Sequence, residues 1–156
     1  MRNAVGEKRT LLKMSLGNLN VGGSHISTSG DFTHTNITAV LLNDIVDSMA
    51  QEGHQKSIEA VMKVDIESYE CKAFLGSPDV FNRGVNFRFI VMEWYFKGRM
   101  GSCTKGELKS MTEMFSTNGY LPYRLKKRKE LNVKSSQIWL PGDVVWVHTS
   151  VQSFMW

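Results

Sequence analysis

Three carboxylates near the ends of two apolar segments are the residues whose types and spacing could do chemistry. Asp65 and Glu67 follow the apolar run in "VMKVDIE", and Glu93 lies inside the next one, "FIVMEWYF". In open parallel sheets, ligands bind beyond the carboxyl ends of the strands. If the two runs are parallel neighbours, the three acids line one crevice. Crowding and partial desolvation there raise a carboxylate's pKa, which predicts a general base that works near neutral pH.

A purely structural role for the same residues stays open. Asp65 can cap the next helix, and Glu67 can favour the dipole of that helix. Glu93 can pair with Lys63 or Arg88. Because ion-pair networks also perturb pKa values, the spacing alone does not choose between structure and catalysis.

The segments that position these acids read as a strand, a helix and a strand. Residues 60–66 are apolar apart from Lys63 and Asp65, which is typical of a strand covered on both faces. Residues 67–75 can form two helical turns, and Gly76 ends them. Residues 89–96 are again almost wholly apolar. Two such strands joined through a helix predict a right-handed unit with parallel strands.

The flanking segments complete an α/β pattern. Further expected elements are strands at Thr10–Leu16, Ile37–Leu41 and "YLPYRL", a helix from Asn43, and a helix capped by Thr104 and Glu107 with Leu108, Met111 and Phe115 facing the core. "QIWL" and "DVVWVH", joined by Pro141-Gly142, are expected to pair antiparallel at the sheet edge. The predicted fold is a mostly parallel sheet with helices on its faces and a late antiparallel element.

The composition is that of a soluble globular domain. The 156 residues suffice for one domain with a sizeable core, and 42% are hydrophobic against 22% charged. No apolar run is long enough to cross a bilayer, and the first residues lack the pattern of a signal peptide. The chain is therefore interpreted as soluble and cytoplasmic by default, with an upstream targeting segment or anchor left open. Asn36-Ile37-Thr38 matches a glycosylation triplet but receives little weight without a secretory signal.

Cysteines, histidines and the basic run indicate no further site. Cys71 and Cys103 are too few for a disulfide framework and lack metal-ligand spacing, and the four histidines are scattered, so no metal is expected. Much of the net charge of +4 lies in residues 124–136, interpreted as a solvated basic loop. Phosphate or nucleic-acid binding by Arg124–Lys129 ranks last, because aromatic residues are not interleaved there.

One family resemblance adds to this pattern. "VMKVDIESYECKAFLGS" followed by "FIVMEWYF" resembles the FkbM-type methyltransferases, whose hallmark is a strand running into Asp-[Val/Ile]-Glu-Gly and then Leu-x-Gly. "KMSLGNLNVGG", "ITAVLLNDIVD", "NGYLPYRL" and "DVVWVH" resemble the family's surrounding segments in order. The match spans roughly residues 10–148 and is specific mainly over residues 61–96.

The resemblance implies a Rossmann-like class I domain over residues 1–156 that uses S-adenosylmethionine to methylate a hydroxyl group of a small molecule or sugar. It implies Asp65 as the proton acceptor or substrate-orienting group. Glu67 would hydrogen-bond the substrate or hold the loop, and Glu93 would join them at the site. Glu70 is interpreted as a helix residue. Magnesium suits such oxygen ligands, but two neighbouring acids are weak evidence for it.

Two departures from the family pattern qualify this expectation. Ser68 stands where the family has glycine, and it is strained if that position needs a positive φ. The glycine-rich cofactor turn is not visible, since Asn20–Ser24 read as a loop, and Ser15 and Gly17 remain only weak candidates for cofactor contacts. The sheet is therefore expected to lack its first strands, as in a carboxyl-terminal part or truncated paralogue. A non-catalytic binding or scaffold domain is the alternative.

Overall fold

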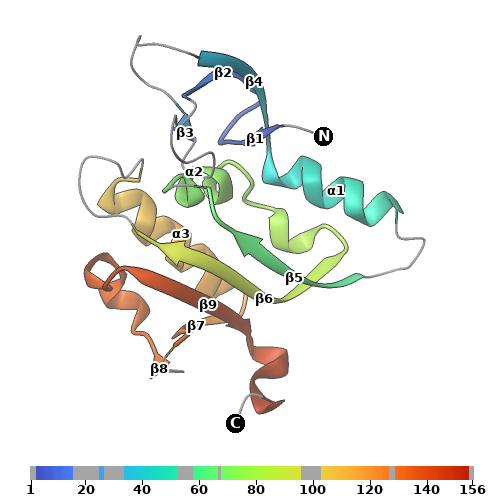
Figure 1. The fold of residues 1–156 in the computed structure, drawn as a ribbon. Helices are drawn as coiled ribbons and strands as arrows, with labels where there is room; N and C mark the ends of the chain where they lie inside the picture. Colours follow the sequence, from blue (N-terminus) through green and yellow to red (C-terminus); the bar gives the residue numbers. More distant parts are fainter. Residues whose placement is uncertain are drawn as a thin grey trace.

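Two sheets and three α-helices make up the computed structural model, which describes residues 3–15, 25–26, 34–52, 58–66, 68–95, 103–126 and 129–154 (Figure 1). The strands are β1 Ala4–Val5, β2 Thr10–Ser15, β3 His25–Ile26, β4 His34–Val40, β5 Ile58–Val64, β6 Val85–Trp94, β7 Tyr120–Arg124, β8 Lys129–Glu130 and β9 Gly142–His148. The α-helices are α1 Leu42–Glu52, α2 Glu70–Leu75 and α3 Lys105–Thr117, and 3-10 helices lie at Val80–Asn82 (η2), Val133–Ile138 (η3) and Thr149–Phe154 (η4). Within these residues no helix is long and apolar enough to span a membrane.

The sheet topology overturns the predicted fold class. The first sheet has the order β1-β4-β2-β3, and the second has the order β5-β6-β9-β7-β8. In the second sheet only β5 and β6 run parallel, while β6–β9, β7–β9 and β7–β8 are antiparallel. The prediction of a mostly parallel, Rossmann-like sheet is therefore wrong: the described chain forms a mixed α/β fold whose pairings are mainly antiparallel.

The reason lies in how the strands are connected. The α2 crossover between β5 and β6 returns the chain in the same direction, as the pattern predicted (Figure 1). After β6, the chain forms α3 and then β7, but β7 is not the neighbour of β6. Strand β9 lies between them and runs antiparallel to both. The expected edge hairpin around Pro141-Gly142 is also wrong, because η3 extends to Ile138, so "QIWL" is not a strand, and β9 is internal to the sheet.

The first strands also differ from the expectation. Strands β2 and β4 pair antiparallel from Thr10↔Ala39 to Ser15↔His34, so they form a sheet of their own instead of extending the second sheet. Strand β5 is consequently an edge strand. Its Glu59, Val61 and Lys63 are exposed, with Val61 at 65% exposure, so the prediction of a strand covered on both faces is wrong.

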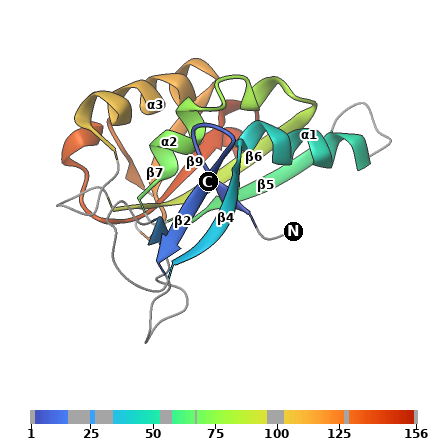
Figure 2. The same cartoon turned by 90° about the horizontal axis from the view of Figure 1, so that it is seen from above.

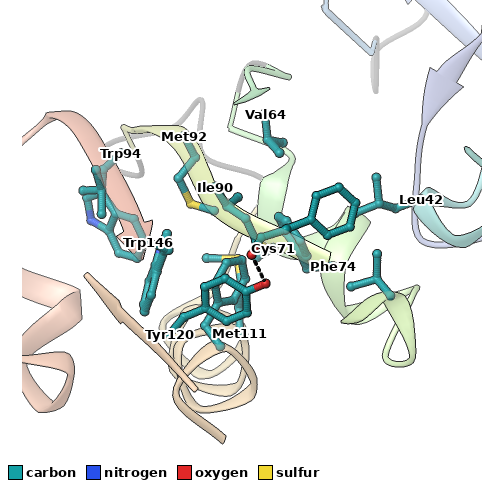
Figure 3. Close-up of a cluster of buried hydrophobic side chains, with 14 of the residues drawn as sticks. Leu42, Val64, Cys71, Phe74, Ile90, Met92, Trp94, Met111, Tyr120 and Trp146 are labelled. Carbon is teal, nitrogen blue, oxygen red and sulfur yellow. Dashed lines mark hydrogen bonds between the residues drawn. The ribbon is translucent and has the colours of Figure 1, made fainter. Parts of the chain in front are cut away.

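The main core lies between the second sheet and helices α2 and α3, which lie together on one side of that sheet (Figure 2). Phe74 of α2 and Phe115 of α3 meet edge to face at 4.7 Å between ring centroids, and Phe115 contacts Trp146 of β9 at 4.6 Å. The Tyr120 hydroxyl donates to the Phe87 carbonyl at 2.7 Å (Figure 3). Burial of these large rings contributes to the apolar area that holds α2 and α3 on the sheet.

Helix α3 matches its prediction closely. Thr104 accepts a hydrogen bond from the Glu107 N–H, and the Glu107 carboxylate accepts one from the Thr104 N–H. The predicted stripe is buried, and Asn118 and Gly119 end the helix, with Gly119 at φ +81°. The capping box and the left-handed glycine therefore set both ends of α3.

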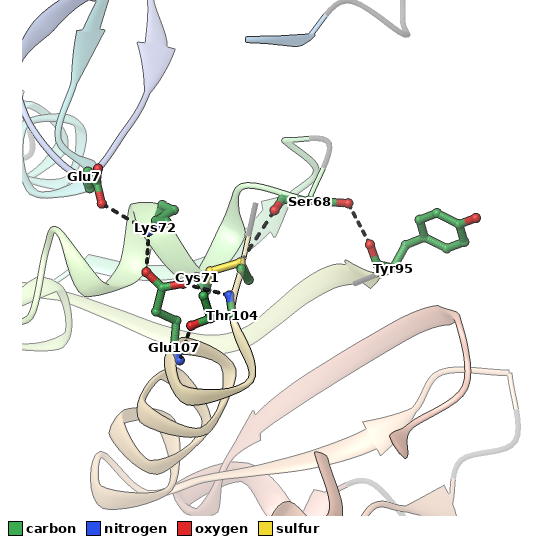
Figure 4. The surroundings of a disulfide bond; sticks show 8 residues. Glu7, Ser68, Cys71, Lys72, Tyr95, Thr104 and Glu107 are labelled. Carbon is green, nitrogen blue, oxygen red and sulfur yellow. Dashed lines mark hydrogen bonds and ion pairs between the residues drawn. A yellow bond between two sulfur atoms is a disulfide. The ribbon is translucent and has the colours of Figure 1, made fainter. Parts of the chain in front are cut away.

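The loop between β1 and β2 packs against the end of α2. A Cβ atom on Gly76 would lie 2.4 Å from the Glu7 Cα, so only glycine fits there. Nearby, the Lys72 ammonium pairs with Glu7 at 3.7 Å and also with Glu107 of α3 (Figure 4). The first sheet is thus attached to the α2–α3 layer through backbone contact as well as charge.

Candidate functional site

The carboxyl ends of β5 and β6 meet at one edge of the second sheet. Their parallel register pairs Val64 with Met92, so Asp65, which follows β5, lies close to Glu93 near the end of β6. This register confirms the prediction that Asp65 and Glu93 are neighbours. Asp65 is partly exposed and accepts a hydrogen bond from Lys63 at 2.9 Å. We call Lys63, Asp65, Glu93 and Asp143 the edge cluster.

Asp143 joins the cluster from β9. It is the direct partner of Glu93 across the antiparallel β6–β9 ladder. Within the described part of the chain, neither Glu93 nor Asp143 forms an ion pair, and like charges so placed repel each other. The hydrogen bond that Lys63 donates to Asp65 raises the pKa of Lys63 most, the negative charge of Asp65 adds to this, and the charges of Asp143 and Glu93 add further. The sequence contains no signal for Asp143, because only the position of β9 brings it here.

The structure also tests the purely structural roles considered for these acids, which were helix capping and ion pairing. Tyr69, without a side-chain cap, occupies the N-cap position of α2, so Asp65 does not cap this helix. Arg88 pairs with Glu59 and also donates to Ser150, so it does not neutralise Glu93. Glu67 lies outside the described residues.

The buried carboxylate of this segment is Glu70, the first residue of α2. It is 1% exposed, and its Oε1 accepts a hydrogen bond from the Ile66 N–H at 3.2 Å. Its Oε2 is buried without a hydrogen-bond partner among the described residues. Burial raises the pKa of Glu70, two backbone hydrogen bonds oppose the shift, and the charges of Asp65 and Glu93 add to it. Sequence reasoning identified Glu70 only as a helix residue and missed its burial.

The turn that carries Asp65 is held by Ser68. This residue has φ +68°, a conformation that favours glycine. Its hydroxyl donates to the Tyr95 carbonyl at 2.6 Å, which ties the turn after β5 to the residue after β6 (Figure 4). Of the conditions considered for this position, the positive φ is therefore the one present. The hydrogen bond offsets part of the cost of placing serine there.

A disulfide lies beside the same turn. Cys71 of α2 and Cys103, just before α3, are joined across 32 positions of sequence, with their Cα atoms 6.0 Å apart. The Cys103 sulfur also lies 3.5 Å from the Ser68 carbonyl oxygen (Figure 4). This disulfide was not predicted, because the spacing of the two cysteines in the chain does not show that α2 and α3 pack together.

Of the two candidate cofactor residues, the structure describes only Ser15, which belongs to the other sheet. Ser15 ends β2 and pairs with His25 and His34 in the first sheet, while Gly17 lies outside the described residues. In the class I fold that the resemblance implied, S-adenosylmethionine would lie at a turn between a parallel strand and a helix N-terminus, close to the methyl acceptor. In the described ranges, the parallel crossover from β5 leads to the turn at Ser68, which the disulfide and Tyr95 occupy. The described residues at this edge therefore do not fit that cofactor.

The arrangement offers carboxylates for hydrogen bonding to a ligand with donor groups. No group of three or more His, Cys, Asp or Glu side chains in the described ranges is placed to hold a metal ion. Tyr95, 48% exposed, follows β6 at the same edge and presents an aromatic ring (Figure 4). No protein-family model matches this chain, and neither the curated proteins nor the solved structures contain a match to it.

Proposed function

We propose that the edge cluster binds the hydroxyl groups of a small molecule or sugar, as the acceptor side of an O-methyltransferase. The observation that carries the proposal is the parallel β5–β6 register, which brings Asp65 and Glu93 to one edge. The FkbM-type pattern over residues 61–96 suggests S-adenosylmethionine as the methyl donor. Because the described residues do not fit that cofactor, the mechanism concerns the acceptor alone.

Asp65 is the residue that orients the acceptor and takes its hydroxyl proton. Its carboxylate is partly exposed, and the Lys63 ammonium holds it from one side at 2.9 Å. Glu93 and Asp143 are exposed, so they can accept hydrogen bonds from neighbouring hydroxyls. The exposed ring of Tyr95 can cover the apolar face of a sugar. Carboxylates beside an aromatic ring match the alternating polar and apolar surfaces of a carbohydrate.

A binding domain without catalytic turnover is the second candidate function. The observation that favours it is the separate sheet of the first strands, in which β2 pairs antiparallel with β3 and β4, where a class I methyltransferase has parallel strands and a cofactor turn. In this case the edge cluster keeps its ligand, and no methyl group is transferred.

The acceptor side is tested by a glycan array followed by calorimetric titration of the best ligand. We expect Asp65→Asn to weaken binding about tenfold, because one charge-assisted hydrogen bond contributes roughly 1.5–3 kcal/mol. Glu113→Gln is the matched control, because Glu113 is an exposed acid of α3 that is not a member of the edge cluster. Equal affinity of Asp65→Asn and the unaltered chain, with thermal unfolding unchanged, would remove Asp65 from the proposal.

Titration with S-adenosylmethionine separates the two candidates. Binding of this cofactor together with methylation of the bound ligand supports the methyltransferase. Ligand binding that depends on Asp65, without cofactor binding, supports the binding domain. The two results concern different ligands, so failure of one does not obscure the other.

A further inference from the structure

Strand β4 carries the one Asn-x-Ser/Thr triplet in the sequence, Asn36-Ile37-Thr38. Asn36 and Thr38 are exposed, while Ile37 between them is half-buried. Successive strand residues point to opposite faces, so the amide of Asn36 and the hydroxyl of Thr38 share the outer face of the first sheet. Asparagine with a hydroxyl two residues later is the acceptor pattern for N-linked glycosylation.

The disulfide is an independent observation about the environment of the chain. Cys71 is fully buried, and both cysteines of the sequence are used in the Cys71–Cys103 bond. Structural disulfides form and persist in oxidising compartments and are rare in the reducing cytosol. In eukaryotic cells the oxidising lumen in which disulfides form is also where N-linked oligosaccharides are added. The disulfide therefore supplies the context that the triplet lacks in the sequence alone.

We propose that Asn36 is an N-glycosylation site, modified in the oxidising lumen of the secretory pathway. The donor is an oligosaccharide attached to a polyprenyl diphosphate. The Asn36 amide nitrogen bonds to the anomeric carbon of the first sugar as the bond from that carbon to the diphosphate oxygen breaks. The nitrogen loses one proton, and the polyprenyl diphosphate leaves, so no oxidant or reductant takes part.

The neighbouring surface suits a covering sugar. Thr38 lies opposite Leu11 of β2, and Asn36 lies opposite Lys13, so all four share one face of the β2–β4 pair. Leu11 is 65% exposed, and Lys13 is also exposed. Diagonal neighbours in such a ladder are about 7–8 Å apart, within reach of the first sugar ring. A glycan on Asn36 would therefore cover the apolar side chain of Leu11.

The test is expression of the whole chain behind a secretion signal in mammalian cells, with protein pooled from cells and medium. Peptide-N-glycosidase F in heavy-oxygen water converts a glycosylated asparagine to labelled aspartate, which mass spectrometry locates. We expect the label at residue 36 in the unaltered chain and in Thr38→Ser. We expect complete loss of glycan in Asn36→Gln and in Thr38→Val, which keeps Asn36 and the strand-forming shape of residue 38.

Thiol labelling of the same samples makes the result decisive. A chain whose cysteines resist labelling and whose Asn36 carries no glycan would overturn the proposal. Its disulfide would show that the chain entered the oxidising lumen, and yet Asn36 would not have been glycosylated there. Glycosylation of Thr38→Val at Asn36 would also overturn it. Pooling cells with medium keeps the test valid if a variant is retained, since the sugar is added before export. The proposal does not depend on the ligand of the edge cluster.

Discussion

The two ends of α2 differ in why a glycine is favoured there: a positive φ favours it at residue 68 before the helix, and lack of space requires it at residue 76 after the helix. Before the helix, Ser68 adopts φ +68°, where glycine is the unstrained residue. After the helix, Gly76 has φ −72°, which any residue adopts, yet a side chain there would strike the backbone of Glu7. The first end restricts the backbone conformation of its residue, and the second end restricts the space for a side chain. Glycine after a helix therefore does not by itself indicate a left-handed turn.

The two ends also differ in what holds them. The first is crosslinked by the Cys71–Cys103 disulfide and by the hydrogen bond from Ser68 to Tyr95. The second rests on the close approach of the β1–β2 loop and on the Lys72 ion pairs. The candidate site lies at the first end, so its geometry depends on crosslinks, while attachment of the first sheet depends on contact at the second. Each prediction below perturbs one end.

The largest expected effect is at the crosslinked end. The double variant Cys71→Ala/Cys103→Ala should lose about 4 kcal/mol of unfolding free energy, as expected for opening a loop of this length in the unfolded chain. Urea unfolding of the variant and of the oxidised chain measures the difference. Reduction of the unaltered chain should reproduce most of the loss. Equal stability of oxidised and reduced chains would show that the bond does not crosslink α2 to α3.

Gly76→Ala should have the next largest effect, a loss of about 3 kcal/mol, because the new Cβ would overlap backbone atoms that cannot rotate away. Gly106→Ala in α3 is the matched control. Its Cβ would have only the Thr104 hydroxyl oxygen nearby, at 3.9 Å, and alanine favours a helix, so a gain of about 0.5–1 kcal/mol is expected. Thermal unfolding of both variants measures the contrast. If Gly76→Ala were as stable as Gly106→Ala, the β1–β2 loop would not rest on α2.

The same contrast explains what could be predicted from the sequence. Local patterns succeeded: the Thr104–Glu107 capping box, the buried stripe of α3 and the parallel β5–β6 pair all depend on residues close together in the chain. A positive φ at residue 68 was raised as one possibility by the glycine of the family pattern, and it is a property of one residue and its turn.

Features that join distant segments could not be predicted in this way. The position of β9 between β6 and β7, the Gly76–Glu7 contact and the disulfide each need knowledge of which elements pack together. The same distinction between local and non-local features applies to the candidate site. Asp65 and Glu93 were predictable from the parallel unit, whereas Asp143 and the burial of Glu70 follow from non-local packing.

The ion pairs at the second end should give a smaller, pH-dependent effect. The hydrogen bond from Lys72, more than the bond from the Thr104 N–H, lowers the pKa of Glu107 to about 2 from an ordinary 4.5. A lowered carboxyl pKa contributes stability that is complete above 4.5 and is lost as the pH falls towards 2. Lys72→Met should therefore cost about 1 kcal/mol at neutral pH, and the difference should shrink over this acid range.

Urea unfolding at several pH values measures that difference. Lys109→Met is the control, because its pair with Glu113 is exposed and 3.7 Å long. Its effect should stay within about 0.5 kcal/mol at every pH. A Lys72→Met loss that is constant from neutral pH to pH 2 would mean that the side chain acts by packing rather than by its charge on Glu107.

The smallest effects concern Ser68, where two substitutions separate backbone strain from hydrogen bonding. Ser68→Ala keeps the strained φ and loses the bond to Tyr95, so a loss of about 1 kcal/mol is expected. Ser68→Gly also loses the bond but relieves a left-handed conformation that costs roughly 1 kcal/mol, so its stability should be close to that of the unaltered chain. Glycine should therefore exceed alanine by about 1 kcal/mol in urea unfolding. Alanine equal to glycine would mean that the turn relaxes out of the left-handed region, in which case Asp65 is not held by backbone geometry at this end of α2.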